Sequence, residues 1–151
     1  MHYLCTMKSN REIFQEKADG YLPCFIDSCT LHSTCLRWLV GQEFSTERIN
    51  TTCVNPKNPK IGGDQCLLYR NSEKVRQAKG MMHFFDEMPR RMEVSIKQEL
   101  IGIYTRKGFY EYRRGDRLIT PEMQRRIAAV CRSYGWTAAP VYDQWVDEYL
   151  W

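Results

Sequence analysis

Five of the seven cysteines lie between residues 24 and 66 and form the densest group of chemically active side chains in the sequence. Their spacing is C-x4-C-x5-C-x17-C-x12-C, formed by Cys24, Cys29, Cys35, Cys53 and Cys66. Thiolates that converge from separate segments bind zinc or an iron–sulfur cluster. The spacing lacks the C-x2-C pair of the common zinc modules, so it predicts a metal site of no named finger class.

A tetrahedral zinc site takes four donors, so one of the five cysteines is surplus. We predict Cys24, Cys29, Cys35 and Cys66 as the ligands. Cys53 ranks last because it follows two polar threonines, although it could equally replace Cys24. His32 lies three residues from both Cys29 and Cys35 and is a further candidate, but a histidine at a helix start is more often simply half-exposed.

The metal itself is predicted to be zinc, because a structural zinc ion asks only for thiolates at tetrahedral corners. An iron–sulfur cluster is the alternative cofactor. The cysteines could also be ordinary buried thiols, since free cysteine is among the most buried residue types, or they could form a redox disulfide. Cys5 and Cys131 lie outside the group, and we interpret both as structural.

The ends and the apolar runs of the chain indicate its compartment. Residues 1–10 do not combine a basic segment with an apolar stretch, and the sequence holds no apolar run long enough to cross a bilayer. We therefore expect a cytoplasmic protein without membrane contact. Thiols stay reduced in that compartment, and clustered cysteines there bind metal more often than they pair.

Charge is distributed unevenly along the chain, which has a net charge of +4. Residues 1–66 carry 7 basic and 7 acidic side chains, whereas residues 70–132 carry 15 basic and 8 acidic ones. Residues 133–151 carry three acidic side chains and no basic ones. This pattern indicates either an anionic partner at the basic region or an acidic tail that folds back on it.

Hydrophobic spacing and turn residues predict the elements that must position these side chains. A short helix is expected near residues 33–40 and an irregular loop over 44–65. Three longer helices are predicted over residues 71–88, 91–104 and 120–134, the last from the start signal Thr120-Pro121-Glu122. Alternating aromatic residues at 109–112 and the segment 117–119 are predicted to pair as a hairpin. We expect the aromatic side chains of residues 140–151 to pack on the helices.

These elements define an α+β fold in a mostly helical single domain, residues 1–151, since this length suits one domain. Within it we expect an irregular cysteine-rich segment, residues 1–70. A helix–helix–hairpin–helix segment, residues 71–151, is expected to follow.

Function is less sharply indicated than the metal site. The three histidines form no recognisable catalytic arrangement, and no glycine-rich phosphate loop is present in the sequence. The leading hypothesis is a non-enzymatic binding or regulatory module with a structural metal. One alternative is an iron–sulfur or metal-dependent enzyme. Another is a nucleic-acid-binding protein that uses the basic region 90–117, with Tyr110 and Tyr112 stacking on bases.

Several motifs resemble those of a known family. They are the cysteine-bearing segment Cys24…Cys29…Cys35-Leu36-Arg37, then Val54-Asn55-Pro56, Cys66-Leu67-Leu68-Tyr69-Arg70, Ser72-Glu73-Lys74-Val75-Arg76-x-Ala78-x-Gly80, Leu118-Ile119-Thr120-Pro121-Glu122 and the closing aromatic segment from Tyr142 to Trp151. Over residues 20–151 the chain resembles an uncharacterised bacterial family labelled only as a domain of unknown function. The resemblance implies a bacterial, cytosolic, single-domain protein and no particular activity.

Overall fold

The computed structural model describes residues 8–151, and its chain divides into two compact units. The first unit comprises Met1–Glu73 together with Leu150–Trp151, and the second comprises Lys74–Tyr149. The chain therefore leaves the first unit once and returns to it with its last two residues. The division falls close to the change in character predicted between residues 70 and 71, while the single domain stays a prediction.

The first unit contains helices α1 (Asn10–Ala18) and α2 (Leu36–Gln42) and a 3-10 turn, η1 (His32–Thr34). A capping box starts α1, because Ser9 accepts from the backbone of Glu12 and the Glu12 side chain bonds back to Ser9. This helix was not predicted from the sequence, although the Ser-x-x-Glu pattern signals it. The predicted helix over 33–40 forms as η1 followed by α2, and Gly41 lies inside α2 rather than ending it.

The remainder of the first unit is irregular, and residues 44–65 contain neither helix nor strand, as predicted. Its last residue, Trp151, packs edge-on against the rings of Phe14 and Tyr21, with centroid distances of 6.4 and 5.3 Å. The Lys17 ammonium lies over the same indole at 4.8 Å from its centroid. The closing residue thus contributes aromatic contacts to the face of α1.

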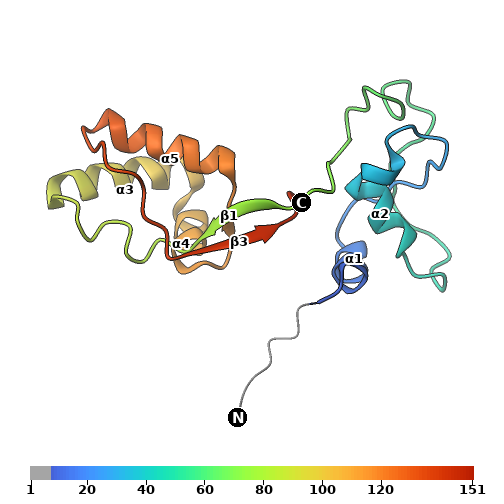
Figure 1. Ribbon diagram of the computed structural model, residues 1–151, viewed down its shortest axis with the longest axis horizontal. Helices are drawn as coiled ribbons and strands as arrows, with labels where there is room; N and C mark the ends of the chain where they lie inside the picture. Colours follow the sequence, from blue (N-terminus) through green and yellow to red (C-terminus); the bar gives the residue numbers. More distant parts are fainter. Residues whose placement is uncertain (1–7) are drawn as a thin grey trace, which may run out of the picture. The chain divides into compact units, whose positions relative to one another are not determined.

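The second unit is built from a small sheet and three helices (Figure 1). Its elements in chain order are β1 (Val75–Lys79), α3 (Arg90–Tyr104), α4 (Arg106–Arg114), β2 (Leu118–Ile119), α5 (Pro121–Ser133) and β3 (Gln144–Glu148). The sheet is antiparallel, with strand order β2-β1-β3. In Figure 1, β1 and β3 run side by side over their whole length, which pairs Val75 with Glu148 and Lys79 with Gln144.

All three helices and the sheet contribute to one hydrophobic core in the second unit. Its most deeply buried members are Ala78, Met81, Ile96, Leu100, Phe109, Ile119, Ile127 and Cys131. Tyr142 packs against this core, with its ring centroid 5.9 Å from that of Phe84, as expected for an aromatic residue of the C-terminal segment. Helices α3 and α5 lie where the sequence predicted them, with Thr120 capping α5. The α+β class is confirmed.

Two predicted elements of this unit are wrong. The helix predicted over 71–88 is replaced by β1 and a turn, because Val75–Lys79 hydrogen-bonds to β3 from the far end of the chain. The strand predicted over 109–112 lies in α4, where Phe109 and Tyr112, three residues apart, are both buried. Leu118 and Ile119 do form a strand, but their partner is β1 rather than residues 109–112.

Candidate functional site

Four cysteines of the first unit line a single cavity of about 20 Å³. They are Cys24, Cys29, Cys35 and Cys66, the four that the spacing predicted as ligands. His32 lines the same cavity, and the other walls include the side chains of Trp38 and Tyr69. Cys53 is exposed and does not line this cavity. The fold therefore gathers four thiols and one imidazole around a small space.

Two successive tight turns present three of these donors. The His32 backbone N–H donates to the Cys29 carbonyl at 3.2 Å, and the Cys35 N–H donates to the His32 carbonyl at 3.1 Å. Each turn closes with a bond between residues three apart, as in a 3-10 helix, where side chains at that interval eclipse one another. Cys29, His32 and Cys35, each three residues from the next, all line the cavity.

Close packing against α2 positions Cys24. The Cys24 N–H donates to the Arg37 carbonyl at 3.0 Å. A Cβ atom on Gly41 would lie 2.5 Å from the Cys24 carbonyl oxygen. Only a residue without a side chain lets the Cys24 segment approach the helix this closely, so Gly41 helps to place Cys24 at the cavity.

Hydrogen bonds from side chains hold the segment that carries Cys66. Thr30 Oγ1 donates to Asp64 Oδ1 at 2.6 Å, and the Tyr69 hydroxyl donates to Thr34 Oγ1 at 3.1 Å. These bonds join the chain on either side of Cys66 to the two turns that carry Cys29 and Cys35. Two segments more than 30 residues apart in sequence therefore meet across the cavity.

Arg37 connects two of the segments that surround the cavity. Its Nε donates to the Leu68 carbonyl at 2.9 Å, and its Nη1 donates to the Leu22 carbonyl at 3.0 Å. Leu22 lies two residues before Cys24, and Leu68 lies two residues after Cys66. The Arg37 guanidinium thus links the segment that carries Cys24 to the segment that carries Cys66. It can do so because a guanidinium has several N–H donors on separate nitrogens.

Burial raises the pKa of the Cys24 thiol above its ordinary value, and the neighbouring Cys35, Cys29 and Cys66 raise it further. A backbone hydrogen bond from Ile26 acts in the opposite direction. Because several thiolates in one small space repel one another, they share it as anions only if a cation balances their charge.

As the side chains stand, residues 8–151 contain no group of three or more His, Cys, Asp or Glu side chains arranged to hold a metal ion. The four thiols share a cavity without adopting tetrahedral coordination. A cysteine side chain has one rotatable bond before its sulfur, so a change of rotamer redirects the sulfur while the backbone stays in place.

The sequence model of DUF6078, a protein family of unknown function, matches residues 7–151 of the chain. The chain belongs to this family. Comparison with curated proteins and comparison with solved structures gave no match. The DUF6078 description names no activity.

Half of the eight basic residues in the region 90–117 of this DUF6078 chain form ion pairs within the second unit. Arg90, Lys107, Arg114 and Arg117 form ion pairs with acidic neighbours. Tyr112 is buried, and Arg117 lies over its ring, so its face is not open to a base. Tyr110 is half-buried beneath Lys97. Nucleic-acid binding at residues 90–117 stays a prediction, and Tyr112 cannot serve as a stacking residue in this conformation.

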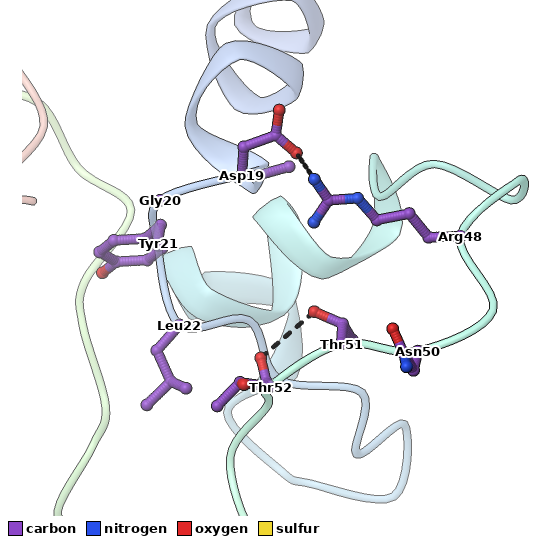
Figure 2. A pocket seen from close by; sticks show the side chains of 9 residues that line it. Asp19, Gly20, Tyr21, Leu22, Arg48, Asn50, Thr51 and Thr52 are labelled. Atoms are coloured by element: carbon purple, nitrogen blue, oxygen red, sulfur yellow. Dashed lines mark hydrogen bonds and ion pairs between the residues drawn. The ribbon is translucent and has the colours of Figure 1, made fainter.

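The first unit also has a larger surface hollow, of about 670 Å³, beside the C-terminal end of α1 (Figure 2). Arg48 pairs with Asp19 at 2.8 Å beside it, and Thr51 Oγ1 donates to the Thr52 carbonyl at 3.4 Å. The charges of the pair therefore neutralise each other.

No helix of the described chain is long and apolar enough to cross a membrane.

Proposed function

We propose that the first unit is a structural zinc module in which four of the five donors around the cysteine-lined cavity hold one zinc ion. The observation that carries the proposal is the convergence of Cys24, Cys29, Cys35, Cys66 and His32 on one cavity from three separate segments. Thiolate and imidazole are the donors that zinc prefers in structural sites. Chance burial of free cysteines gives no reason for four of them to share one space.

The size of the cavity favours a single ion over an iron–sulfur cluster. A volume of about 20 Å³ accommodates one water-sized species, for which the lower limit is roughly 10–15 Å³. A cluster of several irons and bridging sulfides needs more room than this volume offers. Zinc is therefore the metal that we propose, and an iron–sulfur cluster is the outcome that would replace it.

The same small volume supports a structural role rather than a catalytic one. A catalytic zinc ion keeps one coordination position for water or substrate, whereas a structural ion is enclosed by four protein donors. Five donors surround this cavity, so the protein can supply every position itself. We accordingly propose a non-enzymatic binding or regulatory module whose irregular first unit is held together by zinc.

Elemental analysis and a visible spectrum of the full chain, purified without oxygen or chelator, test the proposal. We expect about one zinc per chain and a colourless protein, because zinc has no visible transitions. Replacing Cys29 or Cys35 by serine should abolish stoichiometric zinc, whereas Cys53→Ser, at an exposed position away from the cavity, should retain it. A brown protein with stoichiometric iron, or a wild type without metal, would overturn the proposal.

A further inference from the structure

His32 makes a hydrogen bond that determines which of its ring nitrogens can bind a metal. Its Nδ1 lies 2.7 Å from the backbone carbonyl oxygen of Cys29. A carbonyl only accepts hydrogen bonds, so Nδ1 carries the proton and the neutral ring keeps its lone pair on Nε2. Histidine ligands of metals characteristically donate their second ring nitrogen to a carbonyl or carboxylate in this way.

The imidazole is also held in orientation by its neighbours. The ring of Trp38 contacts it edge-on, with centroids 4.8 Å apart, and Trp38 Nε1 donates to Asp27 Oδ1 at 2.9 Å. Both His32 and Trp38 line the cysteine-lined cavity. A ring fixed by a hydrogen bond on one edge and an indole beside it loses little conformational freedom when a metal binds.

The chain geometry associates His32 with three particular thiols. Cys29 and Cys35 flank His32 in the two tight turns, and all three residues line the cavity. Cys66 is carried by the segment that is hydrogen-bonded to those turns through Thr30–Asp64 and Tyr69–Thr34. Cys24 lies outside these turns, on the segment that is joined to α2 by the bond from its N–H to the Arg37 carbonyl.

We infer that His32 Nε2 is a zinc ligand and that the coordinating set is Cys29, His32, Cys35 and Cys66, with Cys24 lining the site as a fifth, uncoordinated thiol. This inference rests on the proposed zinc site and names its ligands. It departs from the set that cysteine spacing alone predicts, because the bond from Nδ1 to the Cys29 carbonyl exists only in the folded chain. Three thiolates and one imidazole also leave one negative charge less to balance than four thiolates do.

X-ray absorption at the zinc edge of the wild-type full chain tests the ligand set directly, because sulfur and nitrogen neighbours of zinc lie at about 2.3 and 2.0–2.1 Å. We expect three sulfur neighbours and one nitrogen neighbour. Four sulfur neighbours would overturn the inference while leaving the zinc proposal intact. A chain without zinc would instead overturn the proposed function, so the two failures are distinguishable.

Variants assign the nitrogen to its residue. His32→Ala should weaken zinc binding by more than the roughly 10–100-fold that loss of an outer-shell partner costs, and should remove the nitrogen neighbour. His32→Cys should restore binding with four sulfur neighbours, which also guards against a simple folding defect. His83→Ala, at an exposed histidine of the second unit, is the matched control and should leave the spectrum unchanged. Retention of the nitrogen neighbour in His32→Ala would contradict the inference.

The inference that Cys24 does not coordinate zinc allows a second, independent test. Cys24→Ser should keep the three-sulfur, one-nitrogen spectrum and bind zinc about as tightly as the wild type. With cobalt replacing zinc, its visible bands should match those of the wild type, because the ligands are the same. Loss of one sulfur neighbour in Cys24→Ser would show that Cys24 coordinates and would overturn the inferred set.

Discussion

The carboxylate of Asp143 occupies the space that a Cβ atom on Gly80 would fill. Gly80 follows β1 with φ +81°, and its carbonyl accepts from the Asp143 N–H at 3.1 Å. The Asp143 carboxylate then accepts from the backbone N–H groups of Met82 and His83, at 2.8 and 3.2 Å. Gly80 and Asp143 together close the turn that follows β1, and Asp143 immediately precedes the first residue of β3.

Gly80→Ala should destabilise the protein for two reasons that act together. The backbone at Gly80 lies in the left-handed region, where a side chain is strained, and the added methyl would collide with Asp143. We expect a loss of at least about 1 kcal/mol in the free energy of unfolding, measured by urea denaturation. Gly102→Ala is the control: Gly102 lies in α3 with nothing within 4 Å, so alanine should stabilise by up to about 1 kcal/mol. Equal effects of both changes would refute the role of the turn.

Removal of zinc should destabilise the first unit. The donors sit on irregular segments, so metal bonds between them contribute directly to folding. A strong chelator should lower the thermal midpoint, and added zinc should restore it with a dependence on free zinc concentration. Cys35→Ser should lack this response, whereas Cys53→Ser should keep it. A wild-type thermal midpoint that changes with neither chelator nor added zinc would contradict the prediction.

Arg37→Lys should weaken the zinc site without removing a ligand. Lysine cannot donate from two separated nitrogens to the carbonyls of Leu22 and Leu68. We expect a loss of about 1.5–3 kcal/mol in unfolding free energy, as for hydrogen bonds to charged groups, together with weaker zinc binding. Arg11→Lys, in an exposed pair with Glu43, should cost less than about 1 kcal/mol and leave zinc affinity unchanged. Equal zinc affinity in the Arg37 variant and the wild type would show that Arg37 does not position the site.

Cys131 should make the stability of the protein fall at alkaline pH. Burial raises the pKa of its thiol from 9.0 to about 11. Because the folded state holds the proton more tightly than the unfolded state, the contribution is complete below pH 9 and is lost as the pH rises from 9 to about 11. The loss is on the order of 2–3 kcal/mol.

Urea denaturation across this pH range, compared between the wild type and Cys131→Ala, isolates the contribution of the thiol. The variant should be less stable at neutral pH, because a buried side chain is shortened, but its stability should fall less steeply above pH 9. Parallel pH profiles would show that Cys131 does not titrate as its burial requires.

Local patterns in the sequence determined the helices whose signals lie within a few residues of one another. Helix α3 shows its apolar spacing and α5 its Thr120-Pro121 start before any tertiary contact is considered, because capping and periodicity are local properties. The capping box of α1 belongs to the same class and could have been found. Cysteine spacing likewise singled out a group of five thiols, of which four line the cavity, while the choice among the five was left open by the sequence.

Tertiary structure alone decided the features that depend on distant partners. Val75–Lys79 is a strand because Gln144–Glu148 pairs with it, and nothing within the local sequence contains that information. Phe109–Tyr112 is helical because the core accepts Phe109 and Tyr112 from one helix face, although the short run also fits an alternating strand. The orientation of His32 depends in the same way on a carbonyl, an indole and a cavity that exist only once the chain has folded.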